Sequence, residues 1–242
     1  LRQTRSPQEI NYLRQAAGVA DAMMRAAIET AGAGVNEREI AAEAQRAMIL
    51  AGGELPGFGP FIRSTKRLGE EHRSWQDHTL QEGEALFVEL AGCVRRYHAA
   101  MGRLLFVGDA PPGSAEMADI CLQAFRATMQ AIRPGVCGRE VYAAWQRCVD
   151  EAGLAHYRRH HCGYLIGIGF PPSWVGGNMV VGLRHDSELR LAAGMSFHLM
   201  SWLMGAASGV GRSGDAFVSD TVLVTETGCE RLTTVAQGVT VV

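Results

Sequence analysis

The sequence lacks an excess of charge of either sign and has no long hydrophobic run. Its 242 residues contain 23 Lys and Arg against 25 Asp and Glu, which gives a formal net charge of −2. Nucleic-acid-binding domains usually carry a marked basic surplus, and the basic clusters here are as short as residues 157–160. No segment approaches the roughly 18 apolar residues that indicate a membrane-spanning helix. The composition therefore argues against nucleic acid and membrane as partners.

The six cysteines lack the spacing of a zinc site or of a disulfide framework. No CxxC pair occurs, and the cysteines are scattered irregularly between residues 93 and 229. We therefore expect reduced thiols and a cytoplasmic location.

An initiator methionine and an apolar signal core are also absent, since the chain begins Leu-Arg-Gln-Thr-Arg. Such a start is typical of a fragment or a processed form. We expect a single catalytic-type domain over residues 1–242, with an N-terminal domain missing upstream.

The sequence does contain clear helix signals. Ser6, Pro7 and Glu9 supply the N-cap, the first helical position and the N3 residue of a capping box. Apolar residues at helical spacing, interrupted by glycine or proline, extend this pattern to further segments. Helices are predicted over residues 7–31, 36–50, 111–133 and 138–151.

An internal repeat relates the two helix pairs. The segment GVNEREIAAEAQRAMILAG, from Gly34, aligns without gaps with GVCGREVYAAWQRCVDEAG, from Gly135. The shared Gly-Val, Arg-Glu, Gln-Arg and Ala-Gly pairs indicate a duplicated unit. Each helix pair precedes a strand-rich segment, so we predict an α+β fold of two halves, about 1–110 and 111–242, around a pseudo-twofold axis. A ligand pocket is expected between the halves.

One acid interrupts the apolar strands of the first half. Strands are predicted over residues 86–90 and 103–107, with a tight turn between them at Gly92, and Glu89 lies inside the first strand. An acid there must be paired, protonated or directed into a cavity. In the second half, strands are predicted within residues 155–174, over 195–203 and over 220–225. When the two halves are aligned at Gly83 and Gly194, Glu89 corresponds to Met200.

This layout resembles the pita-bread fold of methionine aminopeptidase, aminopeptidase P, prolidase and creatinase. The resemblance covers essentially the whole chain: SPQEINYLRQAA looks like the opening helix, and DTVLVTETGCERLT, from Asp220, looks like the closing strand and turn. It implies a central pocket and commonly a homodimer.

The resemblance also implies a two-metal site, whose ligands this chain has mostly lost. The family's metallopeptidases bind two metal ions with two Asp, one His and two Glu. The corresponding positions here are Glu89, Ala100, Tyr164, Met200 and Ser219. A hard divalent cation needs several oxygen or imidazole ligands, and this set keeps one carboxylate. We therefore predict neither metal nor other cofactor.

Several motifs resemble the metal-free, creatinase-like members that include ectoine hydrolase, which hydrolyse C–N bonds of small polar nitrogen compounds. The matching segments are residues 72–75, 89–92, 96–98 with Arg103, 163–167, 171–174 and 194–198. Two departures are Val175-Gly176, where the ectoine hydrolase pattern carries Gly-Glu, and residues 217–219, where it carries acids.

Metal-free C–N hydrolysis needs a nucleophile or base, an acid for the leaving nitrogen, and donors for the developing oxyanion. The predicted catalytic residues are Glu89, His72, His98, Tyr164 and His198. Glu89 is the candidate nucleophile or base, His72 the general acid or substrate anchor, and Tyr164 the oxyanion donor. The competing interpretation of each is structural: a buried acid, a solvated loop histidine, or an ordinary core residue.

Four further residues are predicted to bind substrate: Trp75, Tyr97, Trp174 and Met200. The two tryptophans would wall the pocket and hold a cationic or planar ligand by cation–π contact, or else serve as core residues. Tyr97 and His98 alternate along a strand, so only one of them can face the pocket, and we favour His98.

The sequence thus predicts a metal-independent hydrolase of a small ectoine- or creatine-like metabolite, with Glu89 central. Two alternatives remain open. One is a non-catalytic pita-bread protein that binds a small molecule or partner after losing the ligands at Ala100, Met200 and Ser219. The other is an Xaa-Pro peptidase.

Overall fold

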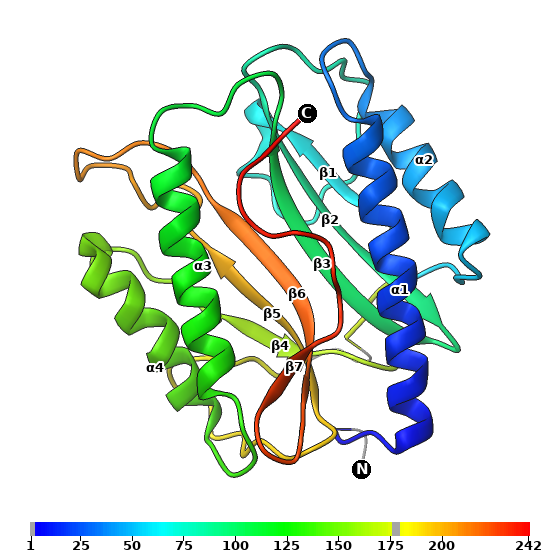
Figure 1. Cartoon of the computed structure of the whole chain (residues 1–242), viewed down its shortest axis with the longest axis vertical. Helices are drawn as coiled ribbons and strands as arrows, with labels where there is room; N and C mark the ends of the chain where they lie inside the picture. The colour runs from blue at the N-terminus through cyan, green and yellow to red at the C-terminus, as the bar shows by residue number, and fades with distance from the viewer. Residues whose placement is uncertain (1–2, 176–179) are drawn as a thin grey trace.

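The computed structural model describes residues 3–175 and 180–242, in which four α-helices cover one face of a curved sheet (Figure 1). The helices are α1 (Pro7–Thr30), α2 (Glu37–Leu50), α3 (Ser114–Ala131) and α4 (Gly138–Val149), with a short 3-10 turn, η1 (Thr65–Arg67), and a π-turn, η2 (Asp150–Leu154). The strands are β1 (Phe61–Ser64), β2 (Ala85–Val94), β3 (Tyr97–Phe106), β4 (Gly163–Leu165), β5 (Ser196–Trp202), β6 (Phe217–Val224), β7 (Cys229–Arg231) and β8 (Thr240–Val241).

The sheet joins the two halves at β3, which pairs with β6 and with the short β8. Its order is β1-β2-β3-β6-β5-β4, all antiparallel, with β7 paired to β6 and β8 running parallel to β3. The first half therefore contributes β1–β3 and the second β4–β6, and they meet at β3 and β6. In the described part of the chain no helix has both the length and the apolarity to cross a bilayer, and all six cysteines are free thiols.

The predicted duplication is confirmed at the level of single hydrogen bonds. The amide of Gly34 donates to the carbonyl of Leu80 at 2.9 Å, and the amide of Gly135 donates to Leu191 at 2.8 Å. Each helix pair therefore joins its strand segment in the same way. Figure 1 shows the result: on the same face of the sheet, α1 and α2 lie over the part formed by β1–β3, and α3 and α4 lie over the part formed by β4–β6.

The predicted helices match the structure to within a few residues. The capping box of α1 is present, with the Ser6 hydroxyl accepting from the Glu9 amide and the Glu9 carboxylate accepting from the Ser6 amide. The predicted turn at Gly92 is wrong. The chain reverses at Arg95 and Arg96, which have φ of 49° and 66°.

Gly92 lies instead inside β2, against α1. A Cβ atom at this position would lie 2.1 Å from the carbonyl oxygen of Ala16. The glycine is therefore needed for the close approach of helix to strand, and it forms no turn.

One segment contains less strand than the sequence predicts. Within residues 155–174 only Gly163–Leu165 forms a strand. Backbone groups beside β4 bond to a later loop: the Cys162 amide donates to Leu183, and the Leu183 amide donates to Gly163. The residues around β4 are apolar because the loop that contains Leu183 covers them.

The two faces of the sheet have different surroundings. Along β2, Leu86 and Val88 pack with the helices, whereas Phe87 and Ala91 belong to a separate apolar cluster on the opposite face. Because side chains alternate along a strand, Glu89 lies on that opposite face, away from the helices.

A buried ion pair joins the halves. The Arg103 guanidinium on β3 donates to the Asp220 carboxylate on β6 at 2.9 Å, and both side chains are at most 1% exposed. Arg103 also donates to the carbonyls of Ser219, Val235 and Ala236 at 2.8 Å. The ion pair therefore holds β3, β6 and the C-terminal segment, which crosses the sheet between the two helix pairs in Figure 1.

Replacing Arg103 by methionine is expected to reduce the free energy of unfolding by about 3 kcal/mol, because the buried Asp220 carboxylate loses its buried cation and keeps Arg231, which is 29% exposed and 3.5 Å away. Denaturant titration measures this loss. The control is Arg14→Met, which removes a pair with Glu230 whose side chains are 48% and 41% exposed and should cost under about 1 kcal/mol. Equal losses of unfolding free energy in the two variants would contradict the conclusion that the Arg103–Asp220 pair stabilises the fold more than an exposed pair does.

Candidate active site

One row of residues crosses the sheet from one half to the other. Glu89 on β2 pairs with Gly102 on β3, Gly102 with Ser219 on β6, and Ser219 with Met200 on β5. Glu89 and Met200, which the repeat relates, therefore lie in one row, and Phe61 on β1 extends this row beyond Glu89. The adjoining row contains Ala100, and His198 pairs there with Tyr164 on β4.

Glu89 is a largely buried carboxyl group. Its side chain is 12% exposed, and Nδ1 of His198 lies 3.7 Å from Oε1 of Glu89. Burial raises the pKa of Glu89 from 4.5 to about 7; Arg63 and Arg159 oppose the rise, and Glu71 adds to it. Glu89 is therefore partly ionised at neutral pH, as a catalytic base requires.

Two adjoining cavities meet at Glu89. The larger, of about 300 Å³, is walled by Phe58 and Trp174, with Tyr164 and His72 also in its lining. The smaller, of about 60 Å³, is bounded by Met200 among others and shares Glu89, His72 and Tyr164 with the larger one. The first volume suits a small metabolite and the second suits one or two water molecules.

A hydrogen-bonded chain runs behind the cavity wall. The Trp174 indole N–H donates to the Tyr164 hydroxyl at 3.0 Å. That hydroxyl lies 2.8 Å from Nδ1 of His198, and Nε2 of His198 lies 2.7 Å from the Ser219 hydroxyl. Burial lowers the pKa of His198 to about 3, so its ring is neutral near pH 7. Burial and the charge of Glu89 raise the pKa of Tyr164 well above 10.

Three more histidines line the cavity. His72 adopts φ of 56°, a conformation uncommon outside glycine, and its ring lies edge-on to Phe61 at 5.5 Å. His160 and His161 have ring centroids 4.2 Å apart. Burial, with repulsion from His160, lowers the pKa of His161 to about 3. The His161 ring is therefore neutral near pH 7 and offers hydrogen-bonding nitrogens to the cavity.

Two arginines balance the charge beside Glu89. Arg63 lies over the Phe87 ring at 4.1 Å, and Arg159 lies over the Trp202 ring at 4.6 Å. Arg159 also pairs with Glu71 at 3.3 Å. Both arginines line the smaller cavity, so their charge acts on the Glu89 carboxylate directly.

Three residues of the predicted site lie elsewhere. His98 is fully buried, accepts a hydrogen bond from the Gly57 amide at 2.9 Å and lies 3.2 Å from the Gly167 carbonyl. Tyr97 donates to Glu9 at 2.6 Å, on the α1 side. Trp75 packs with the helix-side cluster. Both ring nitrogens of His98 contact backbone groups, Tyr97 is bonded to Glu9, and Trp75 packs among apolar residues. None of the three therefore belongs to the proposed catalytic or substrate-binding site.

The site does not fit the two-metal centre that the family resemblance implies. The hydroxyls of Tyr164 and Ser219 bond to His198, and Ala100 and Met200 pack in the apolar cluster of this face. Among the described residues, no group of three or more His, Cys, Asp or Glu side chains is placed to hold a metal ion. Glu89 alone is too small a ligand set for a hard divalent cation.

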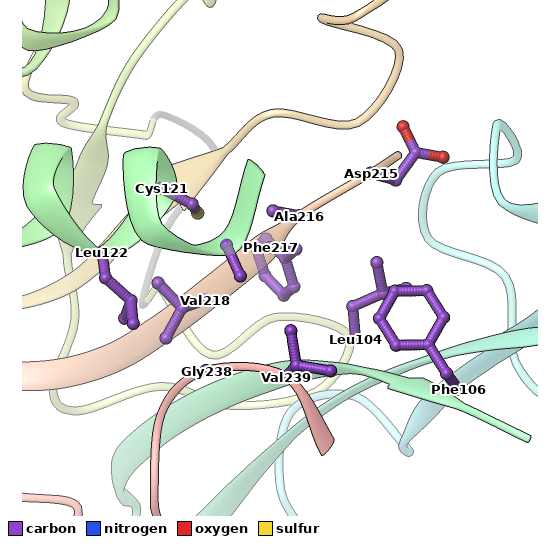
Figure 2. Close-up of a pocket in the computed structure, with 11 residues that line it drawn as sticks. Leu104, Phe106, Cys121, Leu122, Asp215, Ala216, Phe217, Val218, Gly238 and Val239 are labelled. Atoms are coloured by element: carbon purple, nitrogen blue, oxygen red, sulfur yellow. The ribbon is translucent and has the colours of Figure 1, made fainter. Parts of the chain in front are cut away.

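Two other cavities among the described residues lack the chemistry of this one. A cavity of about 10 Å³ between α3, β3 and β6 has room for about one water, and Figure 2 shows it lined by apolar side chains with Asp215 at its edge. A groove of about 870 Å³ beside α4 has one acid in its lining, Asp150, which pairs with Arg158 at 2.9 Å. Neither offers an unpaired buried carboxyl group.

Sequence reasoning assigned no role to several residues of this site. They are Phe58, Arg63, Glu71, Arg159, His160, His161 and Arg184. The arginine inside the apolar run Phe61–Ser64 was a usable signal, because a buried cation requires a partner. The others lie in loops, whose placement follows from the tertiary fold.

Relatives of known sequence are similar over almost the whole chain. An ectoine hydrolase from Halomonas elongata is 30% identical over 240 residues, covering 96% of this chain and 58% of that protein. An Xaa-Pro dipeptidase from Pyrococcus furiosus is 27% identical over 233 residues, covering 96% and 64%. The chain thus spans less than two thirds of the length of these curated relatives.

Solved structures are similar in fold. The prolidase from Pyrococcus furiosus has a TM-score of 0.84 at 26% identity and covers 98% of this chain and 66% of its own. Dipeptidase PepE from Mycobacterium ulcerans has a TM-score of 0.85 at 27% identity, covering 100% and 62%. The predicted pita-bread fold is confirmed. The model of metallopeptidase family M24 matches residues 11–226, and the chain belongs to that family.

Proposed function

We propose that the protein is a metal-independent hydrolase that cleaves a C–N bond in a small polar nitrogen compound. The observation that carries the proposal is the position of Glu89, a buried carboxyl group between a metabolite-sized cavity and a water-sized one. Its pKa, raised to about 7, suits a group that takes and returns a proton near neutral pH.

The arrangement supports a general-base mechanism. An ionised Glu89 removes a proton from a water molecule in the smaller cavity, and the water oxygen attacks the carbon of the scissile bond. The Tyr164 hydroxyl donates to the oxygen or nitrogen on which negative charge develops. The proton then passes from Glu89 to the leaving nitrogen, directly or by way of His72, and the C–N bond breaks.

The walls of the larger cavity favour a planar or cationic substrate group. Phe58 and Trp174 meet edge to face with centroids 5.0 Å apart, and both line the cavity. Aromatic faces attract cations such as amidinium and guanidinium groups. Arg184, also in the lining, would pair with an anionic group on the same substrate. An amidine or guanidine that also carries a carboxylate matches both features.

The similarity to an ectoine hydrolase supports this substrate class, and the similarity to Xaa-Pro dipeptidases supports a hydrolase more broadly. The dipeptidase alternative has less support, because the ligand positions of the two-metal centre hold Ala100, Tyr164, Met200 and Ser219. The non-catalytic alternative rests on the loss of the ligands at Ala100, Met200 and Ser219, but it gives no role to the raised pKa of Glu89. A homodimer and a cytoplasmic location stay predictions.

A substrate panel tests the proposal. We expect the purified protein to hydrolyse ectoine or creatine at a rate that chelator leaves unchanged, and we expect Glu89→Gln to lower kcat by at least about 100-fold because the base is lost. The matched control, Glu29→Gln, removes an exposed carboxyl group on α1 and should leave the rate unchanged. Cleavage of Xaa-Pro dipeptides that chelator abolishes would contradict metal independence.

The raised pKa of Glu89 also predicts a pH-dependent stability difference. The folded protein binds this proton more tightly than the unfolded chain does, so ionisation destabilises it as pH rises from about 4.5 to about 7. Glu89→Gln should therefore gain up to about 3 kcal/mol over the wild type between pH 4.5 and pH 8. Urea titrations at the two pH values measure this gain, with Glu29→Gln as the control. If the difference in free energy of unfolding between Glu89→Gln and the wild type were the same at both pH values, the burial of the Glu89 charge would be contradicted.

A further inference from the structure

We propose that Ser219 holds His198 in the tautomer that carries its proton on Nδ1, and that this leaves the Tyr164 hydroxyl free to donate into the Glu89 cavity. Ser219 and His198 are then positioning residues that do not touch substrate. The tautomer assignment stands on hydrogen-bond geometry alone, and its catalytic consequence rests on the proposed function.

The Tyr164 hydroxyl has one proton and two acceptor sites. The Trp174 indole N–H is only a donor, so the bond of 3.0 Å occupies one acceptor site of the hydroxyl. Nδ1 of His198, at 2.8 Å, can use either the second acceptor site or the proton. The tautomer of His198 therefore decides whether the Tyr164 proton is available to a ligand.

Ser219 distinguishes the two tautomers. Its side chain is fully buried, and His198 is its only hydrogen-bond partner among the described residues. If Nε2 of His198 carried the proton, the Ser219 oxygen would accept it and the serine proton would be buried without an acceptor. If Nδ1 carries the proton, Ser219 donates to Nε2 and Nδ1 donates to Tyr164. The one donor then left over is the Tyr164 hydroxyl, which lines the cavity and can donate to a ligand or water there.

Glu89 favours the same tautomer. Its Oε1 lies 3.7 Å from Nδ1 of His198. An N–H at Nδ1 attracts the carboxylate, whereas a lone pair there would repel it. Ser219 from one side and Glu89 from the other thus select one state, and the Tyr164 proton can turn toward the cavity that this hydroxyl lines.

Two residues of this hydrogen-bonded chain stand at positions where the family resemblance places metal ligands. Tyr164 and Ser219 are two of the five, and each now makes a neutral hydrogen bond to His198. Where a metal would polarise the reacting group, the tyrosine proton is oriented to stabilise it. The lost ligands are thus replaced by a second device for stabilising negative charge.

Nitrogen NMR of protein labelled with 15N-histidine tests the tautomer directly, with the His198 signals assigned from their absence in His198→Gln. We expect the wild type to show a protonated Nδ1 and an unprotonated Nε2. In Ser219→Ala the fraction with protonated Nδ1 should fall, and Ser219→Thr, which keeps the hydroxyl, should restore it. A protonated Nε2 in the wild type would overturn the proposal.

Kinetics test the consequence. With a substrate that is turned over, Ser219→Ala should lower kcat about tenfold with little change in KM, and Tyr164→Phe should lower it about 100-fold. The matched control is Ser201→Ala, which removes another fully buried hydroxyl, bonded to Trp145 at 3.1 Å, and should change neither kcat nor the His198 signals. Wild-type kcat in Ser219→Ala would contradict the role of Ser219.

The two readouts separate the two proposals. The expected tautomer in a protein that hydrolyses nothing would support the hydrogen-bond assignment and refute the proposed function. The opposite tautomer in an active enzyme would refute the assignment and leave the function standing. If Ser219→Ala does not fold, the wild-type spectrum still decides the tautomer.

Discussion

The buried pair of Arg103 and Asp220 is the interaction on which the site depends. It joins β3 to β6, the two strands at which the duplicated halves meet. Gly102 and Ser219, the immediate neighbours of this pair, are the middle members of the row that runs from Glu89 to Met200. A shift of one half against the other would therefore separate Glu89 from His198. Each half supplies part of the cavity lining, so the site forms only when the two halves are held in register.

Burial determines the chemistry of Glu89. In a metal centre, bound cations would stabilise several carboxylates and hold their pKa values low. Here Ala100, Met200 and Ser219 occupy positions where the family's metal centre has ligands, and the face of the sheet that carries Glu89 also carries an apolar cluster. Arg63 and Arg159 offset part of the cost of burial, yet desolvation is larger. The same apolar setting that excludes a hard cation thus converts the remaining acid into a base suited to neutral pH.

The sequence predicted the fold well because its signals are local or repeated. The capping box at Ser6 and the duplicated segments from Gly34 and Gly135 depend on neighbours along the chain. The site was less predictable, because strand alternation allows one of Tyr97 and His98 to face the pocket, and the choice depends on what packs above them. Both face structural partners, Glu9 and Gly57. Loop residues such as His160 gave no pattern at all.

Titration of the Glu89 carboxyl group tests most directly whether an isolated, buried acid replaces the metal centre. Carbon NMR of protein labelled at the glutamate side-chain carboxyls, with Glu89 assigned from the signal missing in Glu89→Gln, follows its ionisation with pH. A midpoint near 7 is the expected result, since burial outweighs the neighbouring arginines. A midpoint at or below the ordinary value of 4.5 would contradict it, because the carboxylate would then be stabilised by a cation or by water.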